Sequence, residues 1–511
     1  MKMNPRRPKQ KTHTNFDGGK SYDITDPFLK MRLVCASCFF GEPQYYRDSE
    51  KRNRVGERED VRRMLSILQP VFTDDWMKLS PKELVEKTID LCLGKDPEKT
   101  LELAVKLRNE DLMRTTPQVI LVRAAMHPLT KGTGMIRHFA DKICKRGDEP
   151  MVCFNYFRKA FPKDKLPMNL KKALKDILEG FDDYTIAKYK MEKSECKMID
   201  VIKYTHAQSP AIDKLFKGKA KQTKTWNSIV SNSKDEKTQT WEKALKTMPH
   251  MALLRNLRNL EQNKVKISLW KEKFLNGVKG GKQFPFRYFS AFKQVANPET
   301  KDAIEEALEI SYENVPHFNG RTLCLSDNSG SATSTTTSEM GTMNISTIGN
   351  LMSIVALKKS DGGDFVIFGD NAEKIECRKK SSTFDILKEA EETRVGGATE
   401  TGLWTWLVKA IEENIYYDRI FVFSDLQAGY GQLYGRKLDK YVFTRTLNCS
   451  YIDVASLINE YRRKVNKNVK VFLIQTAGYH DTIMPEFYKD TYIIGGWSSG
   501  ILNFANEMEK L

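Results

Sequence analysis

The pattern of the chain changes at residues 316–320, Pro-His-Phe-Asn-Gly, and this change most constrains the possible folds. Before it, apolar residues recur every three or four positions, which is the period of a helix. After it, short apolar runs alternate with helical stretches. A chain of 511 residues is long enough for two or more domains with separate cores. We therefore expect an all-helical domain at residues 23–318 and an α/β domain at 319–511.

The second part has the pattern of a doubly wound parallel sheet. Strands are predicted at residues 321–325, 364–368, 419–424, 470–475 and 491–494, with helices at 345–358, 384–393, 401–414 and 453–467. The strands at 419–424 and 470–475 are rich in Ile, Val, Leu and Phe, as expected for strands buried on both faces. Sheets of this kind bind ligands at the carboxyl ends of their strands.

Polar residues follow two of these strands and one glycine loop. Asp327, Ser329 and Ser331 have the spacing D-x-S-x-S after the first strand, Asp425 follows the strand at 419–424, and Thr399 follows Gly-Gly-Ala. Carboxylate and hydroxyl oxygens are ligands that suit Mg²⁺, which leaves positions open for water or a partner. The sequence predicts a divalent-cation site, although an isolated D-x-S-x-S also fits a solvated turn. Asp370, after the strand at 364–368, fits a strand-end cap better than an acidic neighbour of this site.

The first part is predicted to be helical throughout. Helices are expected at residues 26–40, 58–69, 81–93, 97–108, 117–126, 134–146, 150–160, 168–179, 197–204, 237–247, 250–262, 266–276, 285–294 and 299–313. Short polar or proline-containing breaks separate them. Many short paired helices without strands resemble a solenoid of repeats of roughly 40 residues, which offers a concave surface or a ring.

The positive charge is concentrated in the helical part. Residues 1–315 contain 61 Lys and Arg against 42 Asp and Glu, whereas residues 316–511 contain 22 against 24. This asymmetry predicts a polyanion-binding half joined to a neutral half, in competition with a chain that merely uses lysine to solvate its helices. Residues 1–22 are basic and polar, and we expect a disordered arm.

The compartment is predicted from what the composition lacks. No apolar run approaches the roughly 20 residues that span a bilayer, and the first 20 residues contain no signal-peptide core. The nine cysteines are scattered without a framework, as in a reducing compartment. Cys35 and Cys38 form a lone C-x-x-C that fits a helix core better than zinc. We expect a cytoplasmic protein.

A series of motifs then resembles, in one order along the chain, the TROVE module and the von Willebrand factor A domain of Ro ribonucleoproteins. The motifs are Phe-Gly-Glu-Pro-Gln-Tyr-Tyr at 40–46, Arg-Thr-Thr at 114–116, Ala-Lys-Tyr-Lys at 187–190, Trp-Glu-Lys-Ala-Leu-Lys-Thr-Met-Pro at 241–249, Met-Ala-Leu-Leu-Arg-Asn-Leu at 251–257, Phe-Pro-Phe at 284–286, the D-x-S-x-S loop and Leu-Asn-Phe-Ala-Asn at 502–506. The resemblance covers about residues 23–511. It implies a monomeric ring of HEAT-like helical repeats closed by the A domain.

The resemblance also implies function. Members of the family bind the ends of misfolded RNAs in the ring and structured Y RNAs on a basic outer surface, and in bacteria a Y RNA can tether the ring to an exoribonuclease. It implies that the five oxygen-bearing residues form a metal-ion-dependent adhesion site for Mg²⁺. It also implies a role in noncoding-RNA quality control, with no membrane or DNA as partner. The RNA-binding residues expected on this basis are Arg158, Lys171, Lys172, Lys175, Lys190, Lys203 and His206, the last of which fits a helix-end histidine nearly as well.

Two other classes of function compete. A metal-dependent protein-adhesion or scaffolding module would use the A domain, with the helices merely as a linker. A metal-dependent nuclease would need Asp327 and Asp425 to activate water, but the site contains few carboxylates. The sequence shows no Ser/His/Asp or Cys/His arrangement and no phosphate-binding P-loop. We therefore expect a protein that is not an enzyme.

Overall fold

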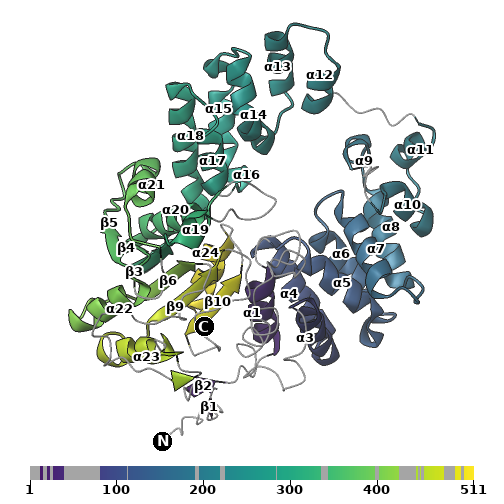
Figure 1. Cartoon of the computed structure of the whole chain (residues 1–511). Coiled ribbons are helices and arrows are strands. Elements are labelled where there is room, and N and C mark those ends of the chain that lie inside the picture. Colours follow the sequence, from purple (N-terminus) through teal and green to yellow (C-terminus); the bar gives the residue numbers. More distant parts are fainter. Residues whose placement is uncertain are drawn as a thin grey trace, which may run out of the picture.

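A computed structural model describes residues 12–14, 20–22, 27–39, 81–111, 113–189, 195–218, 225–283, 285–334, 343–397, 402–424, 445–446, 449–450, 454–476, 490–495 and 500–510. A long array of helices leads into an α/β unit, and both parts are visible in Figure 1. This confirms the predicted order of an all-helical part and an α/β part. Within the described residues no helix is long and apolar enough to cross a membrane.

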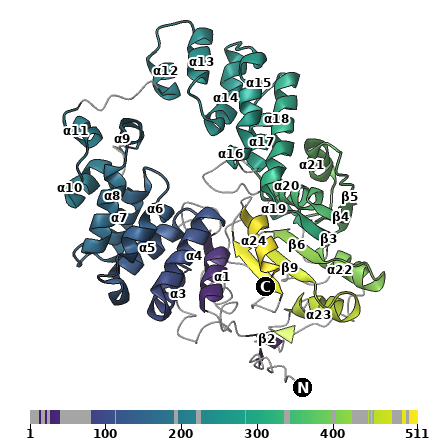
Figure 2. The same cartoon turned by 180° about the vertical axis from the view of Figure 1, so that it is seen from behind.

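The helical array has two arms. The first arm consists of α1 Pro27–Phe39, α3 Pro81–Lys95, α4 Pro97–Asn109, α5 Thr116–Met126, α6 Met135–Ile143, α7 Glu149–Ala160, α8 Met168–Glu179, α9 Asp183–Lys188, α10 Met198–Thr205 and α11 Pro210–Phe216. The second arm consists of α12 Trp226–Asn232, α13 Lys237–Leu245, α14 His250–Gln262, α15 Lys271–Asn276, α16 Val278–Gly281, α17 Pro285–Phe292 and α18 Pro298–Ser311. Figure 2 shows the two arms from behind, with α11 and α12 at their far ends.

Several helices begin with the same local signal, a capping side chain followed by proline. Asp96 accepts a hydrogen bond from the backbone of Lys99, 3.0 Å away, at the start of α4. Ser209 and Asn297 cap α11 and α18 in the same way, and each also precedes a proline. Proline fits the first helical position because its missing N–H has no partner there. The proline breaks in the sequence are thus helix starts.

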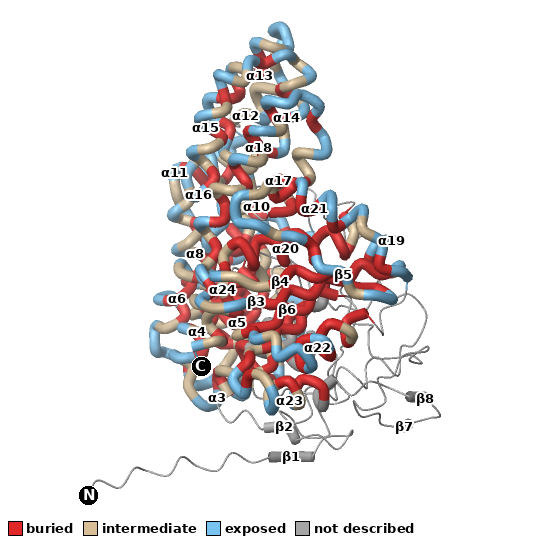
Figure 3. Tube along the Cα trace, turned by 90° about the vertical axis from the view of Figure 1, so that its left-hand side faces the viewer, coloured by how far each residue is buried: buried red, intermediate tan, exposed pale blue. Residues whose placement is uncertain are grey.

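The helices pack through apolar stripes at helical spacing. In α8, Leu170, Leu174 and Leu178 are fully buried, whereas Lys172 on the other side is exposed. Buried segments, red in Figure 3, recur along the helices of the array, although α12 has no buried residue. Burying such side chains contributes roughly 1.5–3 kcal/mol each. The amphipathic pattern therefore determines how the helices stack.

The α/β unit contains a six-stranded sheet in the order β10-β9-β6-β3-β4-β5. The strands are β3 Phe318–Asp327, β4 Ser360–Phe368, β5 Ala372–Ile375, β6 Arg419–Ser424, β9 Lys470–Gln475 and β10 Thr491–Gly495. All neighbours are parallel except β4 and β5. The central strand β6 is buried along its whole length.

Helices connect these strands in two directions from β3. The chain passes through α20 Ile345–Lys358 to β4, then through α21 Thr383–Glu392 and α22 Gly402–Glu412 back across β3 to β6. It continues through α23 Val454–Lys464 to β9, and α24 Gly500–Met508 follows β10. Right-handed connections that leave one strand in opposite directions place helices on opposite faces. The carboxyl ends of β3 and β6 therefore flank the switch point where such sheets bind ligands.

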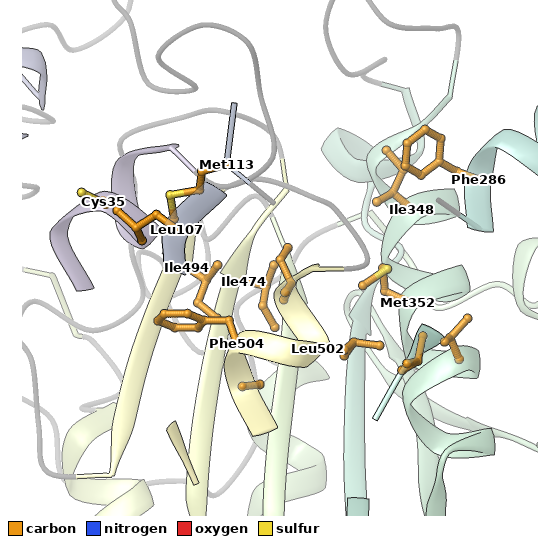
Figure 4. Packing of buried hydrophobic residues seen from close by; sticks show 14 of the residues in the cluster. Cys35, Leu107, Met113, Phe286, Ile348, Met352, Ile474, Ile494, Leu502 and Phe504 are labelled. Carbon is orange, nitrogen blue, oxygen red and sulfur yellow. The ribbon is translucent and has the colours of Figure 1, made fainter. Parts of the chain in front are cut away.

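The α/β unit contacts both ends of the helical array. The first helix, α1, packs on β10, while α17 packs on α20 at the other end. Figure 4 shows Cys35 and Leu107 beside Ile494 and Phe504, whereas Phe286 lies beyond α20 on the opposite side. The chain thus returns to its starting helix, as a ring requires.

The structure also corrects details of the prediction. The helix expected at 266–276 is split at the buried Trp270, whose φ of −130° departs from the helical value. The helix expected at 134–146 ends at Ile143, because Cys144 is extended. Among the described residues of the helical array, four helices of seven residues or fewer, α9, α11, α12 and α16, were not predicted. The helix expected at 58–69 lies outside the described residues, and in the arm expected to be disordered the described residues are the paired strands β1 Thr12–Thr14 and β2 Lys20–Tyr22.

Candidate functional site

The loop after β3 holds a buried carboxylate at the switch point of the sheet. Asp327 is 1% exposed. Its Oδ1 accepts a hydrogen bond from the backbone N–H of Ser329 at 2.9 Å, and its Oδ2 accepts one from Ser424 Oγ at 2.6 Å. Because Ser424 ends β6, this bond joins the two strand ends that flank the switch point. The carboxylate is held rigidly from both sides.

Two hydroxyls stand next to this carboxylate. Ser329 Oγ lies 3.2 Å from Ser331 Oγ, where the short helix α19 Gly330–Ser334 begins. Two oxygens that bind one Mg²⁺ at about 2.1 Å in neighbouring octahedral positions are about 3 Å apart. The spacing of the hydroxyls therefore fits shared coordination of a small divalent cation. In the part of the chain that the structure describes, no group of three or more His, Cys, Asp and Glu side chains is placed to hold a metal.

A glycine loop closes on the same site. The backbone N–H of Gly330 donates to Gly397 O at 3.0 Å, and the N–H of Gly397 donates to Asp370 Oδ2 at 3.0 Å. Gly396 has a φ of +89°, and a Cβ there would lie 2.1 Å from Asp370 Oδ2. Only glycine allows this close approach. Asp370 thus links the end of β4 to the glycine loop.

Two predicted ligands, Thr399 and Asp425, lie outside the described residues. Two described residues lie close to them in the chain: Gly397, two residues before Thr399, and Ser424, directly before Asp425. Gly397 O accepts a hydrogen bond from the N–H of Gly330, and Ser424 Oγ donates one to Asp327. The described residues of the three loops that were predicted to meet at one sheet edge are therefore adjacent.

An amide pair behind the loop completes its support. Asn328 and Asn350 exchange two hydrogen bonds of 2.9 and 3.0 Å, and both side chains are buried. The backbone N–H of Asn328 also donates to Phe368 O at 2.8 Å. Neither Asn350 nor Ser424 was predicted. Ser424 had a signal, since it ends a strand directly before Asp425, whereas Asn350 is one of several small polar residues in α20 and nothing in the sequence sets it apart.

All residues predicted to bind RNA except Lys190 lie on, or directly after, three helices of the first arm that pack against one another, α7, α8 and α10. Among them, Arg158, Lys172, Lys203 and His206 are exposed, whereas Lys171 and Lys175 are half-buried. Lys190 lies outside the described residues.

Direct contacts join these helices near the basic side chains. Lys175 Nζ lies 3.6 Å from Glu179 Oε1, and the same oxygen accepts from the backbone N–H of Gln208 just after α10. The rings of Phe154 and Tyr204 pack with centroids 5.0 Å apart, which joins α7 to α10. The structure therefore brings the end of α10 and the lysines of α8 into one region.

His206 ends α10 in the left-handed conformation, with φ of 56°. Its backbone N–H donates to Ile202 O, while its side chain is exposed. The backbone therefore has a helix-capping role and the imidazole faces solvent. The helix-end interpretation therefore holds for the backbone of His206, and an RNA contact by its exposed imidazole stays a prediction.

The chain is similar to known proteins both in sequence and in fold. The TROVE domain family matches residues 217–318, which span α12 to α18 and the first residue of β3. No curated protein sequence matches the chain. The crystal structure of the Ro (RSR) protein of Deinococcus radiodurans is similar, with a TM-score of 0.63 and 15% sequence identity over 94% of this chain and 99% of that one. That similarity extends through both the helical array and the α/β unit.

Proposed function

Because the chain is a TROVE-domain protein with the fold of a Ro protein, we propose that it binds small structured RNA as part of a ribonucleoprotein. The observation that supports this most directly is the distribution of charge. The helical part has 61 basic side chains against 42 acidic ones, and the α/β part is nearly neutral. Phosphate contacts dominate the affinity of proteins for nucleic acid, so such a surplus favours RNA.

The RNA surface we propose is formed by α7, α8 and α10. Its exposed cations are Arg158, Lys172 and Lys203, with His206 at the edge. Y-like RNA would bind there, and the ends of misfolded RNA would bind to the ring. The protein would act in noncoding-RNA quality control or decay without cleaving RNA itself, and an exoribonuclease would join through the RNA.

The test is recovery of RNA from the native host. We expect cross-linking and sequencing to yield a discrete structured RNA, and the triple variant Lys172→Ala, Lys203→Ala, His206→Ala to lose it. Each phosphate contact removed should also reduce the slope of log affinity against log salt by roughly 0.9. A matched control, Lys388→Ala with Lys409→Ala, removes exposed lysines from the α/β unit.

Four outcomes decide the proposal. Loss of RNA in the triple variant alone supports the proposed surface. Equal loss in the control points to net charge instead of that surface. Absence of any enriched RNA from the wild-type protein contradicts RNA binding, and Mg²⁺-dependent RNA cleavage that Asp327→Ala abolishes would make the protein a nuclease.

A second function is favoured by the hydroxyl pair at the switch point. We propose that Ser329 and Ser331, with Asp327, Thr399 and Asp425, bind Mg²⁺ and present it to a carboxylate of a partner protein. The 3.2 Å separation of the two hydroxyls and the buried carboxylate beside them support this. The cation would supply a Lewis-acidic point of attachment, and Asp327 would hold the loop in place.

Binding of Mn²⁺, measured by electron paramagnetic resonance, tests this site directly. Ser329→Ala with Ser331→Ala should weaken binding at least about tenfold, since it removes two ligands. Ser381→Ala, a matched change elsewhere on the α/β unit, should have no effect. If the double variant binds Mn²⁺ like the wild-type protein, the site is not formed by these hydroxyls. A protein partner lost in EDTA but retained in high salt would establish the adhesion function separately from RNA binding.

A further inference from the structure

Three arginines from separate parts of the first arm converge on two adjacent carboxylates at the start of α7. Arg108 Nη2 lies 2.6 Å from Glu149 Oε1. Arg146 binds Asp148 through two contacts of 2.9 and 3.3 Å. Arg114 Nη2, just before α5, lies 3.9 Å from the Oδ2 of the same Asp148. One carboxylate is therefore shared between two guanidinium groups.

The second carboxylate cannot balance the excess positive charge. Glu149 is 3% exposed, and its Oε2 accepts hydrogen bonds from the backbone N–H groups of Lys145 and Arg146 at 2.5 and 3.0 Å. Burial, and then repulsion from Arg146, lower the pKa of Arg114. The side chains of Arg114 and Arg146 are 38% and 42% exposed, so both remain accessible to a further anion.

An aromatic ring stands beside these cations. The Arg146 guanidinium lies 6.0 Å from the centroid of the Tyr189 ring, and Lys188 Nζ lies 5.1 Å from it. A Cβ at Gly147 would lie 2.5 Å from Tyr189 Cδ2, so glycine there makes room for the ring against the backbone. Tyr189 is half-buried and keeps part of its surface open.

We propose that Arg114, Arg146 and Tyr189 form a subsite for single-stranded RNA. The two guanidinium groups bind one backbone phosphate, because their planar forks match its oxygens, and the neighbouring base stacks on Tyr189. A base that stacks on protein must be unpaired, which excludes duplex RNA from the subsite. The inference rests on the proposed RNA function and adds a second site. Arg158 of the first surface lies at the other end of α7, roughly 14 Å along its axis.

A structural role alone would make different predictions. If the cluster only joins α4, α5 and α7, its loss should lower stability without any particular effect on unpaired RNA. A matched control is available in Arg137 of α6, which is 52% exposed and pairs with Asp176 at 2.6 Å. Arg137→Gln removes the same charge from a pair that is already balanced.

The experiment measures binding of a fluorescein-labelled ten-nucleotide oligouridylate to the full chain by anisotropy over a series of salt concentrations. Arg114→Gln should weaken binding about tenfold or more and reduce the salt slope by about 0.7. Tyr189→Leu should weaken binding about 5- to 100-fold with the slope unchanged, while Tyr189→Phe keeps the affinity. Arg114→Lys keeps the charge without the fork, so it should keep the slope and lose affinity.

Each outcome bears on a separate claim. If the Arg114 and Tyr189 variants bind oligouridylate like Arg137→Gln, the subsite is wrong. It is also wrong if the wild-type protein binds its copurified structured RNA but not oligouridylate, in which case the proposed function stands. If the wild-type protein binds neither RNA, both fail. Thermal unfolding of each variant identifies loss of fold, and Tyr189→Phe and Arg114→Lys test the subsite with the least disturbance.

Discussion

His250 shows how closely a single residue can be fitted into the helical array. Its Nδ1 lies 3.1 Å from Phe274 O and its Nε2 lies 3.0 Å from the hydroxyl of Tyr288. Because a carbonyl only accepts, Nδ1 carries the proton and Nε2 accepts from the tyrosine. A Cβ at Gly277 or Gly281 would lie 3.0 or 2.5 Å from the imidazole, so both glycines make room for it. The site is built for the neutral ring.

Protonation of this ring should destabilise the protein. Burial lowers the pKa of His250 below its ordinary value, so the unfolded state binds the proton more tightly than the folded state. Its contribution to stability is complete above about pH 6.5, the ordinary value, and is lost as the pH falls toward the lowered pKa. We expect a loss of at most about 1.4 kcal/mol per pH unit in that window.

Urea unfolding at pH 7.5 and at pH 5.5 measures this effect. His250→Gln should be less stable at pH 7.5 than the wild-type protein but should lose less stability between the two values. Equal losses in both proteins would show that other groups cause the pH dependence.

From the sequence, residues of the candidate metal site can be grouped only where they stand close together in the chain. Asp327, Ser329 and Ser331 stand within five residues and are found together. The Arg114, Arg146 and Tyr189 cluster was not predicted as a site, since its members are spread over 76 residues. Arg114 and Tyr189 stand in motifs that resemble the family, but neither motif indicates that they meet Arg146. Only the packing of α4 to α9 brings them together.

At the scale of elements, long and buried apolar segments could be predicted from the sequence, whereas short or exposed ones could not. The prediction of β6 at residues 419–424 and of α20 at 345–358 matches the structure, since both are strongly apolar elements in the core. The hairpin strand β5 was missed because Ala-Glu-Lys-Ile is only four residues long, half of them polar, and its two middle residues are exposed. The short helices were missed because fewer than two turns cannot show a helical period.

At the scale of the whole molecule, a cluster of charges joins helices that are far apart in the sequence. Arg32 of α1 binds Asp111 through two hydrogen bonds of 2.7 and 3.0 Å and lies 2.8 Å from Glu507 of α24. Its guanidinium also lies 5.0 Å from the centroid of the Phe504 ring. Lys106 Nζ is 2.9 Å from Glu507. This cluster joins the first helix, the start of the array and the α/β unit.

Removal of Arg32 should weaken the contact between α1 and α24. In Arg32→Met, Asp111 keeps a charge that is 1% exposed without its main partner, and such a loss costs about 3–5 kcal/mol. We expect a lower melting temperature and earlier proteolysis near α1. The double variant Arg32→Met, Asp111→Leu should recover much of the loss, because no buried charge is left unpaired.

Arg137→Met breaks an exposed ion pair in the same array, and it should change the free energy of unfolding by less than about 1 kcal/mol. A double variant as unstable as Arg32→Met would show that geometry, and not buried charge, accounts for the cost.

The junction also has a consequence for synthesis of the chain. Glu507 of α24, the partner of Arg32, is synthesised 475 residues after it (507 − 32), roughly half a minute or more later at 5–20 residues per second. Until then α1 displays the apolar surface that will meet β10. The nascent helical arm is therefore a natural client for chaperones, and slow codons late in the message would prolong the interval in which it can aggregate.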